Sequence, residues 1–198
     1  MPKAARAFVR IVDGFNKGLG RIMMWGFFAM AGILLWSSVS KTLFTPSSWT
    51  LELAQFAMVA YYVLGGPYSI QLGANVRMDL FYAEWSHKKK AWVDAFTVLL
   101  LIFYLGVLLD GALNSMAYSL GYFQTDSLSF YWQLITAFLT GGPDAAADKM
   151  GFIERSPTAW RPVLWPIKLT MIVGFFLMLL QSISELLKDI ARINGEEI

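Results

Sequence analysis

Residues 49–79, WTLELAQFAMVAYYVLGGPYSIQLGANVRMD, decide the fold of this chain. The run from Leu51 to Leu72 carries a single charge and is long enough to cross a hydrocarbon core of about 30 Å, which takes about 20 helical residues. Thr50 is suited to cap the start of a helix, and Glu52 lies in its first turn, where the helix dipole favours a carboxylate. The stretch therefore predicts a membrane-spanning helix over residues 51–72.

Small side chains recur every four residues in the second half of this helix and at its end. They fall on one helical face, which allows another helix to approach closely. Pro67 predicts a kink in the same region, and the chain then turns polar. The candidate contacts with a partner chain are Glu52, Gly65, Ser69, Gly73, Arg77 and Asp79. The alternatives are that the small residues pack against this chain's own helices and that the charges are merely solvated at a membrane boundary.

The composition indicates an integral membrane protein. Of the 198 residues, 57% are hydrophobic and 15% charged, against about 25% charged in typical soluble domains, and the mean hydropathy is +0.51. There is no cysteine and one histidine, His87, which excludes disulfides, iron–sulfur clusters, thiolate zinc sites and a bis-histidine haem within one chain. No GxxxxGK[ST] phosphate loop occurs, so the chain is not itself an ATP-driven pump.

Residues 1–21 have the pattern of a basic amphipathic helix. Its apolar face carries Ala5, Phe8, Val12, Phe15 and Leu19, and the opposite face carries Lys3, Arg6, Arg10, Asp13 and Lys17. This pattern favours an interfacial helix on the anionic cytoplasmic leaflet; the alternative is a simple lead-in to the first span.

Further apolar runs predict spans over residues 22–40, 91–113 and 163–187, giving an all-α protein of four transmembrane helices in a single membrane domain, 1–198. Residues 114–162 form the one long connection. Within it, 128–140 has helical periodicity but is too short to span, so we expect an interfacial helix, with a re-entrant or docked helix as alternatives.

Lys and Arg concentrate in the N-terminal segment, the second connection and the C-terminal tail. By the positive-inside rule both termini are cytoplasmic and residues 114–162 are extracytoplasmic. The ionisable residues of the spans lie toward their ends: Glu52, Asp94, Asp110, Lys168 and Glu185. Because a lone ion-coupled transporter normally has such groups near the bilayer centre, the pattern favours an anchoring or scaffolding subunit that is not an enzyme. The open alternatives are a membrane-anchor subunit of a redox complex and an autonomous four-helix channel or exporter.

Three places resemble the small, Q-type membrane subunit of tripartite ATP-independent periplasmic (TRAP) transporters. Trp49-Thr50-Leu51-Glu52 is similar to the W-x-x-E at the start of that family's second span. Leu64-Gly65 followed by Asn75-Val76-Arg77-Met78-Asp79 is similar to its L-G and H-x-R-x-D, with Asn75 where the family often has histidine. Pro162, Trp165-Pro166-x-Lys168 and Leu180-Gln181 are similar to the fourth span of its longer members.

The resemblance implies a heterodimer with a large membrane subunit that holds the substrate and sodium sites and moves as an elevator. It also implies a periplasmic binding protein that delivers an organic acid for sodium symport. This chain would be the fixed scaffold in a bacterial inner membrane, multi-pass, in contact with lipids, without nucleic acid, and without a cofactor or metal of its own.

Overall fold

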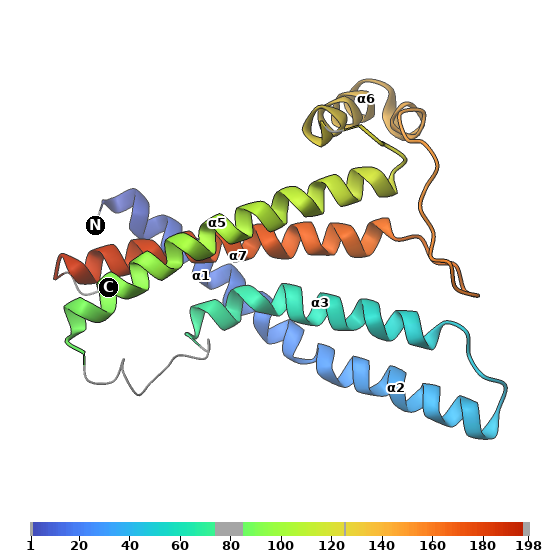
Figure 1. Ribbon diagram of the computed structural model, residues 1–198, viewed down its shortest axis with the longest axis horizontal. Coiled ribbons are helices and arrows are strands. Elements are labelled where there is room, and N and C mark those ends of the chain that lie inside the picture. Colours follow the sequence, from blue (N-terminus) through green and yellow to red (C-terminus); the bar gives the residue numbers. More distant parts are fainter. Residues whose placement is uncertain (1, 74–84, 125, 196–198) are drawn as a thin grey trace. The chain divides into compact units, whose positions relative to one another are not determined.

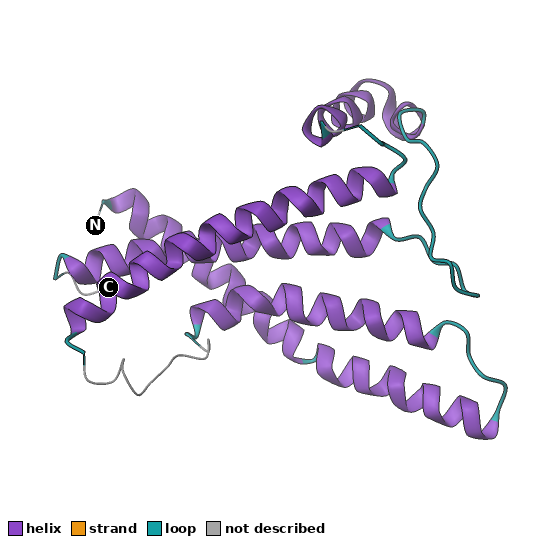
Figure 2. Cartoon of the chain, in the orientation of Figure 1, coloured by secondary structure: helices purple, strands orange, loops and turns teal. Residues whose placement is uncertain are grey.

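The computed structural model describes residues 2–73, 85–124 and 126–195 (Figure 1). Of the described residues 79% are helical, and Figure 2 shows that they form helices and loops without strands, which confirms the all-α prediction. The helices are α1 (Lys3–Met24), α2 (Gly26–Leu43), α3 (Thr50–Gln71), α5 (His87–Ser119), α6 (Ser127–Ala147) and α7 (Trp165–Ile193).

Three stretches of the described chain are long and apolar enough to cross a membrane: Lys3–Leu43, Trp92–Ser119 and Trp165–Ile193. The first joins α1 to α2, because Trp25 keeps helical backbone angles and its N–H donates to Ile22 O at 3.1 Å. Helix α3 has 22 residues and thus spans about 33 Å, but tyrosines, glycines and a proline lower its hydropathy. A fourth span, through α3, stays a prediction.

The chain divides into two compact units. Unit 1 consists of Met1–Phe27, Tyr61–Val107 and Val173–Ile198, and unit 2 of Phe28–Ala60 and Leu108–Ile172. Helices α3, α5 and α7 each contribute residues to both units.

Glycines allow the helices of unit 1 to approach closely. A Cβ atom at Gly20 of α1 would lie 2.4 Å from Cγ of Tyr68 in α3, and one at Gly174 of α7 would lie 2.8 Å from the backbone oxygen of Val63 in α3. Gly66 faces α7 in the same way. Small residues at helix interfaces permit dispersion contacts that larger side chains would prevent.

The face of α1 that packs on the protein coincides only in part with the predicted apolar face, and one residue of the predicted polar face turns inward. The helix buries Val9, Val12, Asn16 and Gly20, whereas Phe15 is 58% exposed. A heptad repeat drifts about 20° per seven residues around a straight helix, so a stripe drawn at heptad spacing leaves the buried face. Asp13, predicted on the polar face, turns toward α7.

In unit 2, α6 packs one face against the end of α5. The buried core consists of Ala117, Leu120 and Phe130, and the hydroxyl of Tyr131 donates to the backbone oxygen of Leu113 at 2.7 Å. Residues 128–140 are therefore part of a helix that is docked through one face.

Two local features set the bounds of α6. Asp126 caps its start, because the carboxylate accepts from Ser129 N at 3.2 Å. Gly142, with φ 79° and ψ −168°, interrupts the helix just before Pro143, whose ring is incompatible with an unbroken helix.

Candidate functional site

The start of α3 is fixed to the end of α2 by hydroxyl groups. Thr50 is 1% exposed, and its Oγ1 donates to Ser37 Oγ at 3.1 Å and lies 3.0 Å from Ser47 Oγ. Ser47 Oγ in turn lies 3.2 Å from Ser40 Oγ. The hydroxyl of Thr50 therefore bonds α2 and the connecting turn instead of capping a backbone N–H of α3.

Glu52, a predicted partner contact, is 5% exposed and bonded to its own chain. Its Oε1 accepts from the hydroxyls of Ser156 and Thr158, both in the loop before α7. Its Oε2 is buried and has no hydrogen-bond partner among the described residues. In this structure Glu52 therefore positions the loop, and a contact with a partner chain stays a prediction.

The loop that Glu52 holds is a closed turn. Ser156 N donates to Pro162 O at 2.9 Å, and Leu164 N donates to Glu154 O at 3.2 Å. Arg161, near the end of the turn, has a positive φ of 49°, a conformation that is uncommon outside glycine and marks a backbone fixed by its surroundings.

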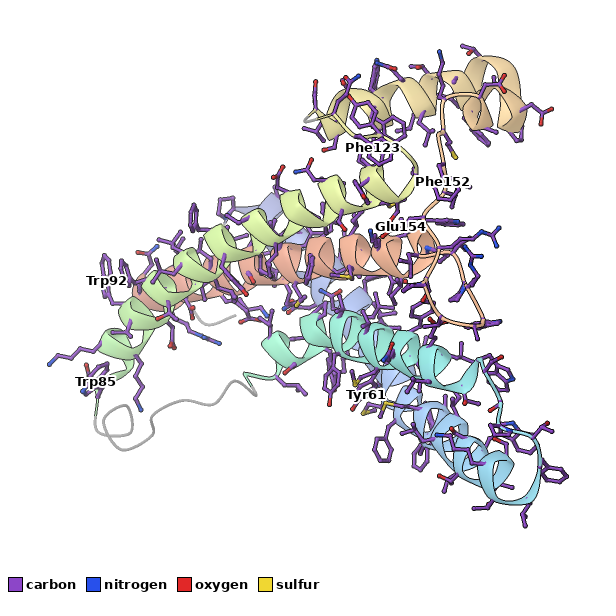
Figure 3. All side chains as sticks on the ribbon, turned by 45° about the vertical axis from the view of Figure 1, so that its right-hand side comes forward. Tyr61, Trp85, Trp92, Phe123, Phe152 and Glu154 are labelled. Carbon is purple, nitrogen blue, oxygen red and sulfur yellow. The ribbon has the colours of Figure 1, made fainter. Side chains whose placement is uncertain are left out.

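The base of the loop is anchored by Glu154, which Figure 3 shows beside the start of α7. Its carboxylate accepts from Lys168 Nζ at 2.7 Å and from the hydroxyl of Ser119. The hydrogen bond from Lys168, followed by that from Ser119, lowers the pKa of Glu154 below its usual value. Lys168 also donates to Ser115 O at 3.1 Å. The ammonium, which the sequence places toward the end of its predicted span, is thus bound within the protein.

The predicted small-residue face of α3 lies open at two of its three positions. Nothing lies within 4 Å of a Cβ atom built on Gly65, and Ser69 is exposed. Gly73 instead ends the helix: its φ is 61°, and its N–H donates to Ile70 O at 3.0 Å. Gly65, Ser69 and Gly73 as partner contacts stay predictions. Arg77 and Asp79, together with Asn75, lie outside the described residues.

The sequence reading missed a buried polar cluster between α1 and α7. Asp13 Oδ1 accepts from Gln181 Nε2 and from Ser184 Oγ, both at 2.9 Å. Its Oδ2 lies 2.6 Å from Lys188 Nζ, and these two side chains are 21% and 13% exposed. The carboxylate is therefore fully engaged by one face of α7.

Gln181 is the centre of this cluster, which we call the α1–α7 clamp (Asp13, Asn16, Gln181, Ser184, Glu185, Lys188). It is fully buried, its second N–H donates to Glu185 Oε1 at 3.0 Å, and its Oε1 accepts from Asn16 Nδ2 at 2.8 Å. The signal was present in the sequence, since positions 181, 184 and 188 share one face of an apolar helix, and polar groups in a membrane helix normally face protein.

These polar groups hold helices and a loop together. No group of three or more His, Asp or Glu side chains within the described ranges is placed to bind a metal ion.

Comparison with known proteins identifies the family. The model of the DctQ component of tripartite ATP-independent periplasmic transporters matches residues 30–140, more than half of the chain. No curated protein and no solved structure gives a significant match. The matched residues include α3, the W-x-x-E motif at its start, and the L-G and R-x-D motifs that follow. The third set of similar residues, which begins at Pro162, lies beyond the match. The chain belongs to the DctQ family, the small integral membrane component of TRAP transporters.

Proposed function

We propose that this chain is the fixed scaffold of a sodium-coupled TRAP transporter and supports a large elevator-type subunit that imports an organic acid. A periplasmic binding protein delivers that acid, and sodium binds in the large subunit. The observation that carries the proposal is the family match over residues 30–140. Both termini are cytoplasmic, α3 is a fourth span, and the membrane is the bacterial inner membrane.

The surface of α5 supports a scaffold role. Between Asp94 and Asp110 the helix has no charged residue, and side chains at i, i+3, i+4, i+7, i+8 and i+11 are each more than half exposed. These are Phe96, Leu99, Leu100, Phe103, Tyr104 and Val107. Such a continuous apolar face is stable only against lipid or another apolar helix, and it offers no polar path for a solute.

The charged groups of the clamp support the same conclusion. Asp13 and Lys188 neutralise each other within the protein, and Glu185 also pairs with Lys188 at 2.8 Å. Transport sites need ionisable groups that exchange partners during the cycle, whereas these groups are held by several contacts each. These contacts support our proposal that ion coupling belongs to the large subunit.

Reconstitution tests the proposal. Proteoliposomes would contain this chain alone, its large-subunit partner alone, or both, with the binding protein outside and an inward sodium gradient. We expect uptake from a panel of radiolabelled organic acids only when both membrane subunits and the sodium gradient are present. Uptake by this chain alone would overturn the scaffold role, and gradient-independent uptake by the complex would overturn sodium coupling.

Cross-linking tests the predicted interface on α3. The chain has no cysteine, so single variants Gly65→Cys and Ser69→Cys can carry a photoreactive label without background. Gly106→Cys on α5, where a Cβ atom has open space, is the matched control. We expect adducts with the large subunit from positions 65 and 69 in excess of those from position 106. Equal yields from all three positions would remove the α3 face from the interface.

A further inference from the structure

We propose that α1 is a binding helix for anionic phospholipid headgroups, with an apolar stripe that enters the lipid and a basic stripe that pairs with phosphate. The lipid stripe consists of Ile11, Phe15 and Ile22, and the basic stripe of Lys3, Arg6, Arg10, Lys17 and Arg21. The proposal concerns this chain alone and does not depend on its role beside a large subunit.

One face of α1 packs against the protein, so the lipid stripe and the basic stripe lie on the outward side of the helix. Val9 and Val12 are 6% and 8% exposed, and Asn16 is 1% exposed. Asn16 bonds Gln181, and Asp13 bonds three side chains of α7. These contacts fix the orientation of α1 about its axis in this structure, so the side chains on its other faces point away from the protein.

The lipid stripe is apolar and lies open. Ile11, Phe15 and Ile22 are 70%, 58% and 64% exposed, and their spacing of four and seven residues places them in one row along the helix. This row differs from the face that heptad spacing predicts, since Val12 of that face is buried in the protein. Large side chains exposed in a row on a helix with basic neighbours are typical of insertion at a membrane interface.

The basic stripe favours lipids whose headgroups are negatively charged. Its five side chains are exposed, and none of them forms an ion pair within the described part of the chain. The one acidic residue of α1, Asp13, is bound to Lys188 on the inward face. Among the described residues, the outer surface of α1 therefore carries positive charge with no compensating carboxylate, which attracts an anionic leaflet.

Small residues separate the two stripes. No atom lies within 4 Å of a Cβ atom built on Gly14 or Gly18. The backbone between the stripes is therefore accessible, and a phosphate held by the basic stripe can lie close to the helix while its acyl chains cover the lipid stripe. A neutral protein helix would satisfy only the lipid stripe and leave the cations unpaired.

A fluorescence titration of the full chain tests the proposal. Ile11→Cys labelled with an environment-sensitive dye, purified in a neutral detergent, would be titrated with phosphatidylglycerol or with phosphatidylcholine of the same chain length. We expect a blue shift that saturates with phosphatidylglycerol and weakens with added salt, because surface electrostatics are screened.

Charge variants provide the matched comparison. The triple variant Arg10→Gln/Lys17→Gln/Arg21→Gln should raise the midpoint for phosphatidylglycerol at least about tenfold, since each cation near an anionic surface contributes separately. The control Lys149→Gln/Arg155→Gln/Arg161→Gln removes three exposed cations outside α1 and should change it less than about twofold. Circular dichroism would confirm that both variants keep their helix content.

Three results would overturn the proposal. Equal responses to phosphatidylglycerol and phosphatidylcholine would show that charge does not select the lipid. Equal midpoint changes in the two triple variants would place the lipid contact outside α1. A label that responds only when the large subunit is added, and not to lipid, would assign the face to a protein interface.

Discussion

Replacing Gln181 by leucine should weaken the attachment of α1 to α7 with little change in side-chain size. Gln181 makes three side-chain hydrogen bonds in the clamp: it donates to Asp13 and Glu185 and accepts from Asn16. Leucine keeps the apolar volume but can form none of these bonds. The change therefore isolates the polar contribution to helix attachment.

The expected loss of stability is about 3 kcal/mol. Side-chain hydrogen bonds between membrane helices contribute about 0.6 kcal/mol each on average, and those to charged groups in water-soluble proteins about 1.5–3 kcal/mol. In addition, Asn16 is 1% exposed, so its amide would lose its partner without access to water, which costs about 1–3 kcal/mol. The bond from Ser184 and the ion pair with Lys188 still hold Asp13, which limits the loss.

The free energy of unfolding would be measured by titrating the detergent-solubilised chain with sodium dodecyl sulfate and recording circular dichroism. Limited trypsin digestion reports on α1 itself, because a helix detached from α7 frays, and its backbone then becomes open to cleavage after Arg10, Lys17 and Arg21 in the native detergent. The matched control is Gln133→Leu on α6, where the side chain is exposed and the expected change is within about 0.5 kcal/mol. If the two substitutions cost the same, or if trypsin cleaves α1 no faster in Gln181→Leu, the clamp does not hold the helix.

Two further predictions concern other contacts. Gly174→Ala should destabilise the chain by about 1–3 kcal/mol, because the new methyl group would lie 2.8 Å from the backbone oxygen of Val63. Its control is Gly106→Ala, where a Cβ atom has open space. This control should stabilise the chain by about 0.5–1 kcal/mol in the dodecyl sulfate titration. The depressed pKa of Glu154 means that its ion pair with Lys168 contributes stability above the usual carboxyl pKa and loses it as the pH falls through the lowered value. The melting temperature should therefore drop at acidic pH more steeply in the native chain than in Glu154→Gln, and parallel curves would refute the assignment.

The sequence predicts features of this fold that depend on local composition. Long apolar runs identify α2, α5 and α7, because the length of a membrane helix follows from bilayer thickness and helix rise. The W-x-x-E and R-x-D motifs indicated the family that the comparison then identified. The periodicity of residues 128–140 predicted the helix now seen as α6, but its docking on α5 depends on a tyrosine and a backbone oxygen 18 residues apart.

The glycine contacts show where local pattern is insufficient. Recurrence every four residues singled out Gly65, whose surroundings are open, whereas the close approach of α3 to α7 occurs at the next residue, Gly66. A small residue permits close packing but does not specify which neighbour provides it. That choice depends on Met178 and Val63 filling the space opposite each glycine, and these contacts join segments more than 100 residues apart.

The same reasoning explains why Asp13 was placed on the wrong face of α1. An amphipathic pattern assigns all charged residues of a helix to the face turned away from the protein. By that pattern, Asp13 is predicted to lie on the same face as the lysines and arginines. In the structure, three side chains of α7 provide two hydrogen bonds and an ion pair to the carboxylate. The free energy required to bury Asp13 is therefore smaller than that of leaving Lys188 and Gln181 without a partner in an apolar helix. Turning the acid inward also leaves the basic stripe on the outer surface without an acidic residue of α1 beside it. Internal attachment of α1 and its attraction to an anionic leaflet are thus two consequences of one side-chain orientation.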